Sequence, residues 1–177
     1  MSIIEKKVSP VASPVRLLLR GLRPKGFGLL EIVIGLAVIA LFLFGVLAVA
    51  RLSLRLSEEN ANNIKAAFLL EEGTEALKIL RDAGWQQNIA SLAISGDYYL
   101  SFNNGQWQAD SSNIFIDGLF ERKLRLENVY RDSQDRLAES GALDANTKKA
   151  SLFVSWRSRG ATTTKTISTY LTNLFDN

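Results

Sequence analysis

The chain contains one long apolar run, residues 27–50, in which Glu31 is the only charged residue. As an α-helix, these residues would extend about 36 Å at ~1.5 Å per residue, and the hydrocarbon core of a bilayer is ~30 Å thick. The pattern therefore predicts one helix that crosses a membrane.

The helical pattern continues past this run to about Asp82. Residues 51–82 contain no proline, and apolar residues recur there at three- and four-residue steps while charged residues lie mostly on the other side. The recurring apolar residues, which we expect to be buried, are Ile64, Ala67, Phe68, Leu70, Leu77 and Leu80. We expect the helix to end at Ala83-Gly84, and Trp85 to pack back against its apolar face.

After Gly84 the pattern is typical of strands. Residues 96–109 form two short alternating runs that flank Asn104-Gly105, a pair that favours a tight type I′ hairpin turn. A second group begins at about Gly118, where Phe120, Leu124 and Leu126 alternate with charged residues, as in a half-buried strand.

The last third of the chain predicts one loop and two further strands. Residues 132–149 are polar and suggest an exposed loop. Leu152, Val154 and Trp156 then alternate with polar neighbours, and the turn at Arg159-Gly160 leads into a β-branched strand at residues 164–171. The expected fold is α+β, with a long N-terminal helix packed on a small antiparallel meander.

Charge indicates how the predicted membrane helix is oriented. Residues 1–25 carry six basic residues and one acidic residue, a net charge of +5. Positive charge next to a membrane segment stays on the cytoplasmic side, so we expect the N-terminus inside. Placing an ionised, unpaired carboxylate within the membrane costs a few kcal/mol, so we expect Glu31 to have a charged partner or a functional role.

The residues around this carboxylate carry a family resemblance. Lys25-Gly26-Phe27 follows the basic leader, Glu31 comes four residues after Phe27, and a long apolar helix follows. This arrangement resembles the class III signal of type IV prepilins and of the pseudopilins of type II secretion. The likeness is specific over residues 25–50 and only architectural beyond them.

The resemblance implies how the chain is processed. In that family a membrane prepilin peptidase cuts after the glycine, here Gly26, and methylates the new N-terminal residue, here Phe27. The glutamate, here Glu31, guides assembly. The implied partners are the prepilin peptidase, an inner-membrane assembly platform, other pilin subunits and membrane lipid.

Two other interpretations of the N-terminal region were weighed. A secretory signal peptide also starts with basic and apolar segments, and Ala48-Val49-Ala50 resembles its small-residue cleavage site. Its apolar core, however, is usually 7–15 residues long and lacks a glutamate. The other interpretation is an uncleaved signal anchor that holds a binding domain and never polymerises.

Three regions follow from this reading: a cleaved leader at residues 1–26, a membrane and polymerisation helix at residues 27–54, and a soluble head at residues 55–177. Without the leader, 15 basic and 17 acidic residues remain, a net charge of −2. The sequence pI near 9.3 therefore reflects the leader, and no nucleic-acid partner is predicted.

Composition argues against catalysis. The chain has no cysteine and no histidine, which excludes disulfides, Cys-rich zinc sites and Cys–His or Ser–His pairs. It also lacks a phosphate-binding glycine loop. We therefore expect no enzyme activity, no cofactor and no metal site.

Three weaker signals were each set against an ordinary structural role. Loop carboxylates could bind calcium but lack EF-hand spacing; they are Asp132, Asp135, Glu139 and Asp144. The aromatic residues Tyr98, Tyr99 and Trp107 could bind sugar or DNA, but packing explains them better. The basic cluster Arg122, Lys123 and Arg125 is flanked by Glu121 and Glu127, which argues against phosphate binding.

The sequence thus favours a structural subunit of a type IV pilus-like or type II secretion pseudopilus filament. We expect an inner-membrane precursor with its N-terminus inside, followed by a cell-surface or periplasmic filament. Major or minor subunit, and pilus or secretion system, remain open at this stage, as does the particular role of the filament.

Overall fold

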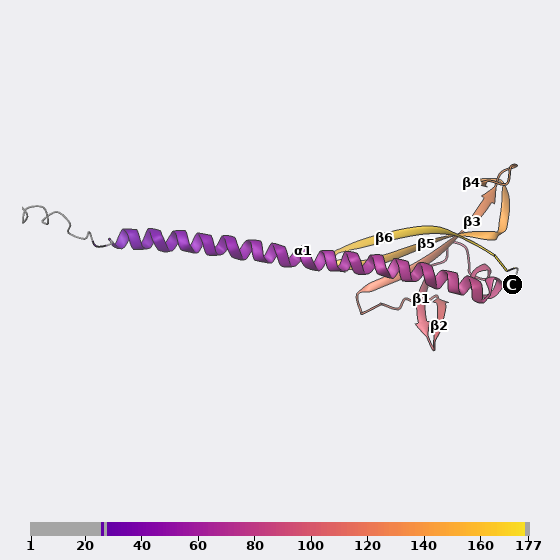
Figure 1. Ribbon diagram of the computed structural model, residues 1–177, viewed down its shortest axis with the longest axis horizontal. Helices are drawn as coiled ribbons and strands as arrows, with labels where there is room; N and C mark the ends of the chain where they lie inside the picture. Colours follow the sequence, from indigo (N-terminus) through magenta and orange to yellow (C-terminus); the bar gives the residue numbers. More distant parts are fainter. Residues whose placement is uncertain (1–25, 27, 176–177) are drawn as a thin grey trace, which may run out of the picture. The chain divides into compact units, whose positions relative to one another are not determined.

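The computed structural model describes residue 26 and residues 28–175. Its elements are the helix α1 (Leu29–Ala83), the short π-helical segment η2 (Gln86–Ala90) and the strands β1 (Tyr98–Asn103), β2 (Gln106–Asp110), β3 (Phe120–Arg131), β4 (Leu137–Ala138), β5 (Ala142–Ser158) and β6 (Ala161–Thr172) (Figure 1). The chain divides into two compact units, Met1–Arg51 and Leu52–Asn177. In the second unit the helix packs on an antiparallel sheet, so the fold is α+β as predicted.

Local sequence rules explain where α1 begins and ends. The Gly28 carbonyl accepts hydrogen bonds from the N–H groups of Glu31 (2.9 Å) and Ile32 (3.2 Å), which opens the helix. All three prolines lie before residue 25, so none interrupts it. Gly84 follows its last residue with φ +156°, a conformation that side chains disfavour, and the predicted end is confirmed.

The sheet has the strand order β2-β1-β3-β5-β6, and every neighbouring pair is antiparallel. It is not the simple meander that we expected, because β1 lies between β2 and β3. The β1–β2 hairpin places its second strand at the sheet edge, and the chain then returns past β1 to begin β3. The short strand β4 pairs with the far end of β3.

Both predicted hairpin turns are confirmed. Asn104 (φ 51°) and Gly105 (φ 79°) join β1 to β2, and Arg159 (φ 52°) and Gly160 (φ 84°) join β5 to β6. Positive φ at both central residues is the mark of a type I′ turn, which suits the twist of the strands on either side.

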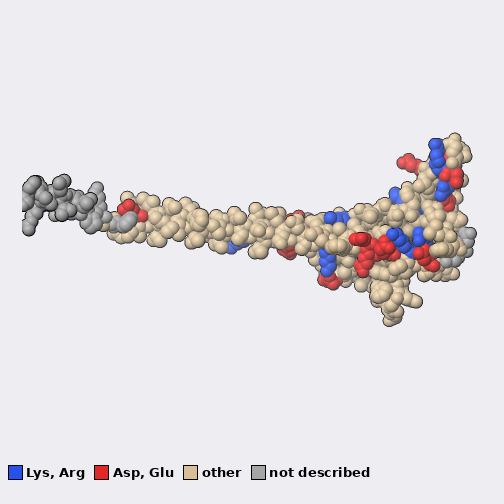
Figure 2. Space-filling view, viewed as in Figure 1, with Lys and Arg blue, Asp and Glu red and all other residues tan. Residues whose placement is uncertain are grey.

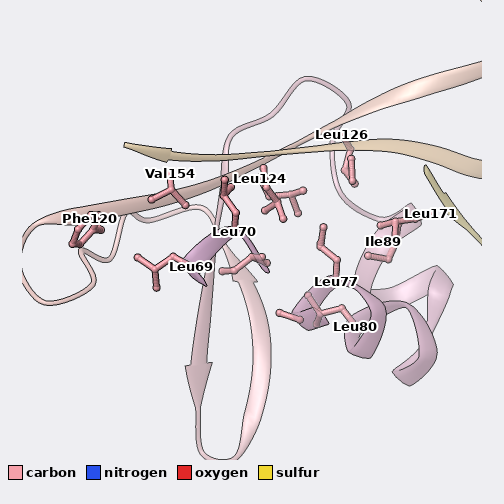
Figure 3. Close-up of a cluster of buried hydrophobic side chains, with 14 of the residues drawn as sticks. Leu69, Leu70, Leu77, Leu80, Ile89, Phe120, Leu124, Leu126, Val154 and Leu171 are labelled. Carbon is pink, nitrogen blue, oxygen red and sulfur yellow. The ribbon is translucent and has the colours of Figure 1, made fainter. Parts of the chain in front are cut away.

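The core forms where the second half of α1 meets the sheet (Figure 3). Seven residues of α1 are buried there: Ala66, Leu69, Leu70, Gly73, Ala76, Leu77 and Leu80. They pack against inward side chains of β3 and β5, among them Phe120, Leu124, Leu126, Leu152, Val154 and Trp156. Trp85 is 1% exposed within this core, so its predicted packing is confirmed.

The predicted buried face of α1 is wrong at two large residues. Ile64 is 58% exposed and Phe68 is 64% exposed. The sheet contacts the other side of α1, on which the seven buried residues recur at three- and four-residue steps. The approach is closest at Gly73, where an added Cβ would lie 3.2 Å from both Arg122 Cδ and Leu152 Cδ1. A bulky side chain at that position would hold the helix away from the sheet.

The loop predicted at residues 132–149 is also wrong for most of its length. Leu137–Ala138 is β4, and residues 142–149 belong to β5, which continues to pair with β3 beyond a bulge at Asn128/Val129. Cross-strand ion pairs support these polar strands, with Arg131 Nε 2.7 Å from Asp144 and Lys149 Nζ 2.9 Å from Glu127. The π-helical segment η2 was likewise not predicted.

The core also contains a charged side chain. Arg122, on β3, is 4% exposed, and its guanidinium donates to Glu72 (2.5 Å) and to the carbonyls of Leu69 (3.4 Å) and Leu100 (3.2 Å). The guanidinium also lies 5.0 Å from the ring centroid of Trp107. Arg122 therefore ties α1, β1, β2 and β3 together.

Replacing Trp156 by alanine should lower the free energy of unfolding by about 3–5 kcal/mol, because the ring is 2% exposed and packs 5.8 Å from that of Phe120. Urea unfolding of the detergent-solubilised chain, followed by circular dichroism, measures this. The matched control is Tyr170→Ala, at a ring that is 51% exposed, and it should cost less than about 1 kcal/mol. Equal losses for the two variants would contradict this description of the core.

Arg122→Met should destabilise the fold by about 2–4 kcal/mol, because it leaves the Leu69 and Leu100 carbonyls without their buried donor. Glu72→Gln should cost about 1 kcal/mol or less, since that side chain is half exposed and water can replace it. The same unfolding measurement compares the two. A larger loss for Glu72→Gln would show that the ion pair, and not the carbonyl contacts, holds Arg122 in place.

Candidate functional site

The predicted processing site lies just before α1. Gly26 is exposed, and a Cβ placed there would meet nothing within 4 Å; the same is true of Gly28. Phe27, the residue predicted to become the methylated N-terminus, and the leader at residues 1–25 lie outside the described residues. The described residues therefore leave the Gly26 side of the Gly26–Phe27 peptide bond unobstructed.

Glu31 lies in the first turn of α1, as its spacing from Gly26 requires. Its N–H bonds the Gly28 carbonyl at 2.9 Å, and its side chain is exposed. A carboxylate at this end of a helix is favoured by the helix dipole, which contributes roughly 0.3–1 kcal/mol at exposed positions. Among the described residues, no lysine or arginine forms an ion pair with it.

The helix around Glu31 is apolar on every side. All residues from 29 to 50 are exposed in the single chain, and Leu29 and Phe42, for example, remain 84% and 70% exposed. Figure 2 shows this stretch as almost free of charge. The segment is long and apolar enough to cross a membrane. Such a surface must be covered by lipid, by other helices, or first by lipid and later by other helices.

The apolar stretch ends at two basic residues on α1. Arg51 and Arg55 follow it at a spacing of one helical turn, and both are exposed. Cations at this position are typical of the level where a helix leaves the hydrocarbon core, because long basic side chains reach the headgroups.

The acidic loop residues bind arginines in this structure. Asp132 Oδ1 accepts the N–H groups of Gln134 (2.8 Å) and Arg136 (3.0 Å), and its other oxygen accepts Arg136 Nε (2.9 Å). These bonds, first that from the Arg136 backbone and then that from its side chain, lower the pKa of Asp132. Burial raises the pKa of Asp144, but hydrogen bonds from Arg131 and Thr147 outweigh it, and the net shift is downward.

These arginine contacts leave the loop carboxylates poorly placed for calcium. Asp135 and Asp144 both face Arg131, at 3.6 Å and 2.7 Å. Within the described part of the chain, no three acidic residues come together as a metal site would require. A cation here would first have to displace the guanidinium groups.

The three basic residues of β3 do not form one patch. Arg122 points into the core, whereas Lys123 and Arg125 pair with Asp97 at 3.1 Å and 2.6 Å. Those two contacts, that of Arg125 first, lower the pKa of Asp97. The burial of Arg122 was not predicted, although Arg122 lies two residues from both Phe120 and Leu124, and alternate residues of a strand share one face.

The aromatic residues of the first hairpin make packing contacts. The Tyr98 hydroxyl accepts the Ala93 N–H at 2.7 Å, and Trp107 lies 5.3 Å from Phe102 between ring centroids. Burial, followed by the nearby charge of Glu121, raises the pKa of Tyr99. These contacts account for the rings without a ligand.

Gly26 and Glu31 thus remain the candidate functional residues. The sequence placed them within one short segment, and the described structure adds that Glu31 lies in the first turn of α1, which is apolar and uncovered on every side as far as residue 50. Comparison with family models, with curated proteins and with solved structures finds no match.

Proposed function

We propose that this chain is a subunit of a type IV pilus-like or type II secretion pseudopilus filament. In this proposal it is cut after Gly26, methylated at Phe27 and polymerised through residues 27 to about 54. The observation that carries the proposal is the single carboxylate, Glu31, in the first turn of a helix that stays apolar and uncovered for a further five turns.

The energetics of Glu31 favour an intermolecular partner. Cleavage after Gly26 would create a positive amine at Phe27, four residues before the carboxylate. Within one chain the amine and the carboxylate would lie on the same helix face, and their pairing would not fix the position of a neighbouring chain. Between staggered chains the same pair would satisfy both charges in apolar surroundings and fix the axial offset of the subunits.

The uncovered helix supports the same proposal. A helix with one apolar stripe needs one partner, whereas a helix that is apolar all round needs to be surrounded. Lipid surrounds it in the precursor, and the helices of neighbouring subunits would surround it in a filament. Transfer between two apolar environments involves little change in hydrophobic energy, so pairing of Glu31 would decide when a subunit leaves the membrane.

Partners and location follow from this proposal. The precursor would lie in the inner membrane with its N-terminus in the cytoplasm, where a prepilin peptidase and an assembly platform act on it. The assembled form would be a periplasmic or cell-surface filament of pilin subunits. The rival is a membrane-anchored binding domain that never polymerises, and the two experiments below distinguish them.

Mass spectrometry of the membrane or filament fraction should find a mature N-terminus at Phe27 with one added methyl group. Gly26→Leu should accumulate as the uncut precursor, because a bulky side chain would obstruct the peptidase cleft. Gly28→Ala is the matched control and should be cut normally, since that glycine lies beyond the bond. An N-terminus at Arg51, or an intact leader in the wild-type chain, would rule out prepilin processing.

Glu31→Val should insert into the membrane and be cut as the wild-type chain is, because removing a charge eases insertion. It should be depleted at least about tenfold from sheared filaments, since the subunit loses the carboxylate that pairs with a neighbouring amine. The measurement is the ratio of filament to membrane protein. Glu59→Val, outside the apolar stretch, should keep the wild-type ratio. Normal assembly of Glu31→Val would favour the anchored monomer.

A further inference from the structure

The strand β6 ends the sheet with a long and regular free edge. It pairs with β5 over all twelve of its residues, Ala161–Thr172, without a bulge. It has no proline, and Lys165 is its only charged residue. Edge strands normally carry prolines, bulges or several charged side chains, which prevent another strand from adding to them. The opposite edge, β2, has only five residues.

The hairpin register shows which backbone groups of β6 are free. Ser158 and Ala161 flank the two-residue turn, and the residues that close such a turn are hydrogen-bonded to each other. Bonded and non-bonded pairs alternate along an antiparallel ladder. Thr164, Thr166 and Ser168 are therefore non-bonded positions, whose N–H and C=O groups point away from β5.

A groove runs beside the middle of this edge, between β6 and α1. It has a volume of about 520 Å³, and its apolar lining includes Leu70 of α1 and Ile167 of β6. Ile167 is 43% exposed, although its cross-strand partner Leu152 is 1% exposed. The helix therefore covers β5 at this level and leaves the inward side of β6 open around Ile167, although Leu171 further along is buried in the core.

The charges at this groove select the side chain that would enter it. Glu71 and Glu75 line its α1 side; Glu71 forms no ion pair with any described residue, and Glu75 contacts Lys78 at 2.7 Å. Lys165 lines the β6 side, and no described carboxylate pairs with it. Two carboxylates on one wall favour a cation, and the single lysine opposite disfavours a second one.

We propose that β6 binds an extended segment of another protein, which adds to the sheet as a further strand. Main-chain bonds to Thr164, Thr166 and Ser168 would hold the segment. Its alternate side chains would enter the groove, apolar ones against Leu70 and Ile167 and one lysine or arginine beside Glu71 and Glu75. A free edge supplies affinity in this mode of recognition, and the adjoining pocket supplies specificity.

The other face of the added strand would meet hydroxyl groups. Thr164 and Ser168 point to that face and bond Ser155 and Ser151 of β5, each at 2.9 Å. Threonine at the alternate ligand positions would extend these rows, because cross-strand hydroxyl pairs stabilise sheets. The ligand that fits is thus a strand with threonine or serine on one face, and one basic residue between apolar ones on the other.

The probe is the peptide acetyl-Thr-Val-Thr-Lys-Thr-Val-Thr-amide with a fluorescent label, added to the full chain in detergent micelles. Fluorescence anisotropy should show saturable binding that empty micelles lack. Replacing the peptide lysine by glutamate should weaken binding at least about tenfold, because it would face Glu71 and Glu75. Absence of saturable binding, or equal binding of both peptides, would overturn the proposal.

Thr166→Pro tests the edge itself. It removes an outward N–H without breaking a bond to β5, and it should weaken binding at least about tenfold. Thr166→Val keeps that N–H and should bind as the wild-type chain does. Should Thr166→Pro not fold, N-methylation of alternate peptide residues removes the same bonds from the ligand side and should also abolish binding. Unchanged binding of the methylated peptide would contradict strand addition.

Two further measurements distinguish strand addition at β6 from filament assembly and from dimerisation of this chain. Glu31→Val should bind the peptide normally, because α1 lines the groove only with residues 67–75 and not with its apolar stretch, so a failure of filament assembly would leave the β6 result intact. Light scattering of the unliganded chain should show no dimer that forms through the β6 edge. A dimer of this kind would be recognised because Thr166→Pro dissociates it. Such a dimer would mean that a second copy occupies the edge, and would overturn the proposed ligand.

Discussion

The compact unit Leu52–Asn177 depends on the close contact between α1 and the sheet at Gly73. A Cβ at that position would come within 3.2 Å of side chains on both β3 and β5, so no larger residue fits without a shift of its neighbours. Ala66 and Ala76, each fully buried, extend the same small-residue face. Because the chain has no cysteine, packing at this face must hold the helix to the sheet without disulfides.

Arg122 belongs to this contact, although it is charged. Its aliphatic stem fills the space opposite Gly73, and its guanidinium reaches the carbonyls of Leu69 and Leu100 and the carboxylate of Glu72. A buried cation is tolerated when most of its donors find acceptors; here α1 provides two and β1 provides one, while Arg122 Nε has no partner among the described residues. The residue thereby helps to fix the register of the helix on the sheet.

Two surfaces that this packing leaves exposed can bind other molecules. The apolar stretch at residues 29–50 is uncovered on all sides, and β6 exposes a full row of backbone groups. The two differ in the physics of recognition. Lipid or other helices can cover the first without directional bonds, whereas the second presents directional N–H and C=O groups, which water hydrates unless another extended chain pairs with them.

Much of this protein follows from local sequence rules. The extent of α1 follows from uninterrupted apolar and helical patterning with glycine at its end, and the two type I′ turns follow from Asn104-Gly105 and Arg159-Gly160. Each depends on backbone preferences that act within a few residues. The candidate residues Gly26 and Glu31 could be proposed for the same reason, because their motif is linear.

Other features depended on partners distant in the sequence. Ile64 and Phe68 are four residues apart, as on one helix face, but the sheet meets the opposite side of α1, so both stay exposed. Residues 142–149 have the composition of a loop, yet they form a strand because β3 supplies its hydrogen-bonding partner. The position of β1 between β2 and β3 and the open edge of β6 arise in the same way. Each is decided by which elements meet in space, and a pattern along one segment contains no information about its partner.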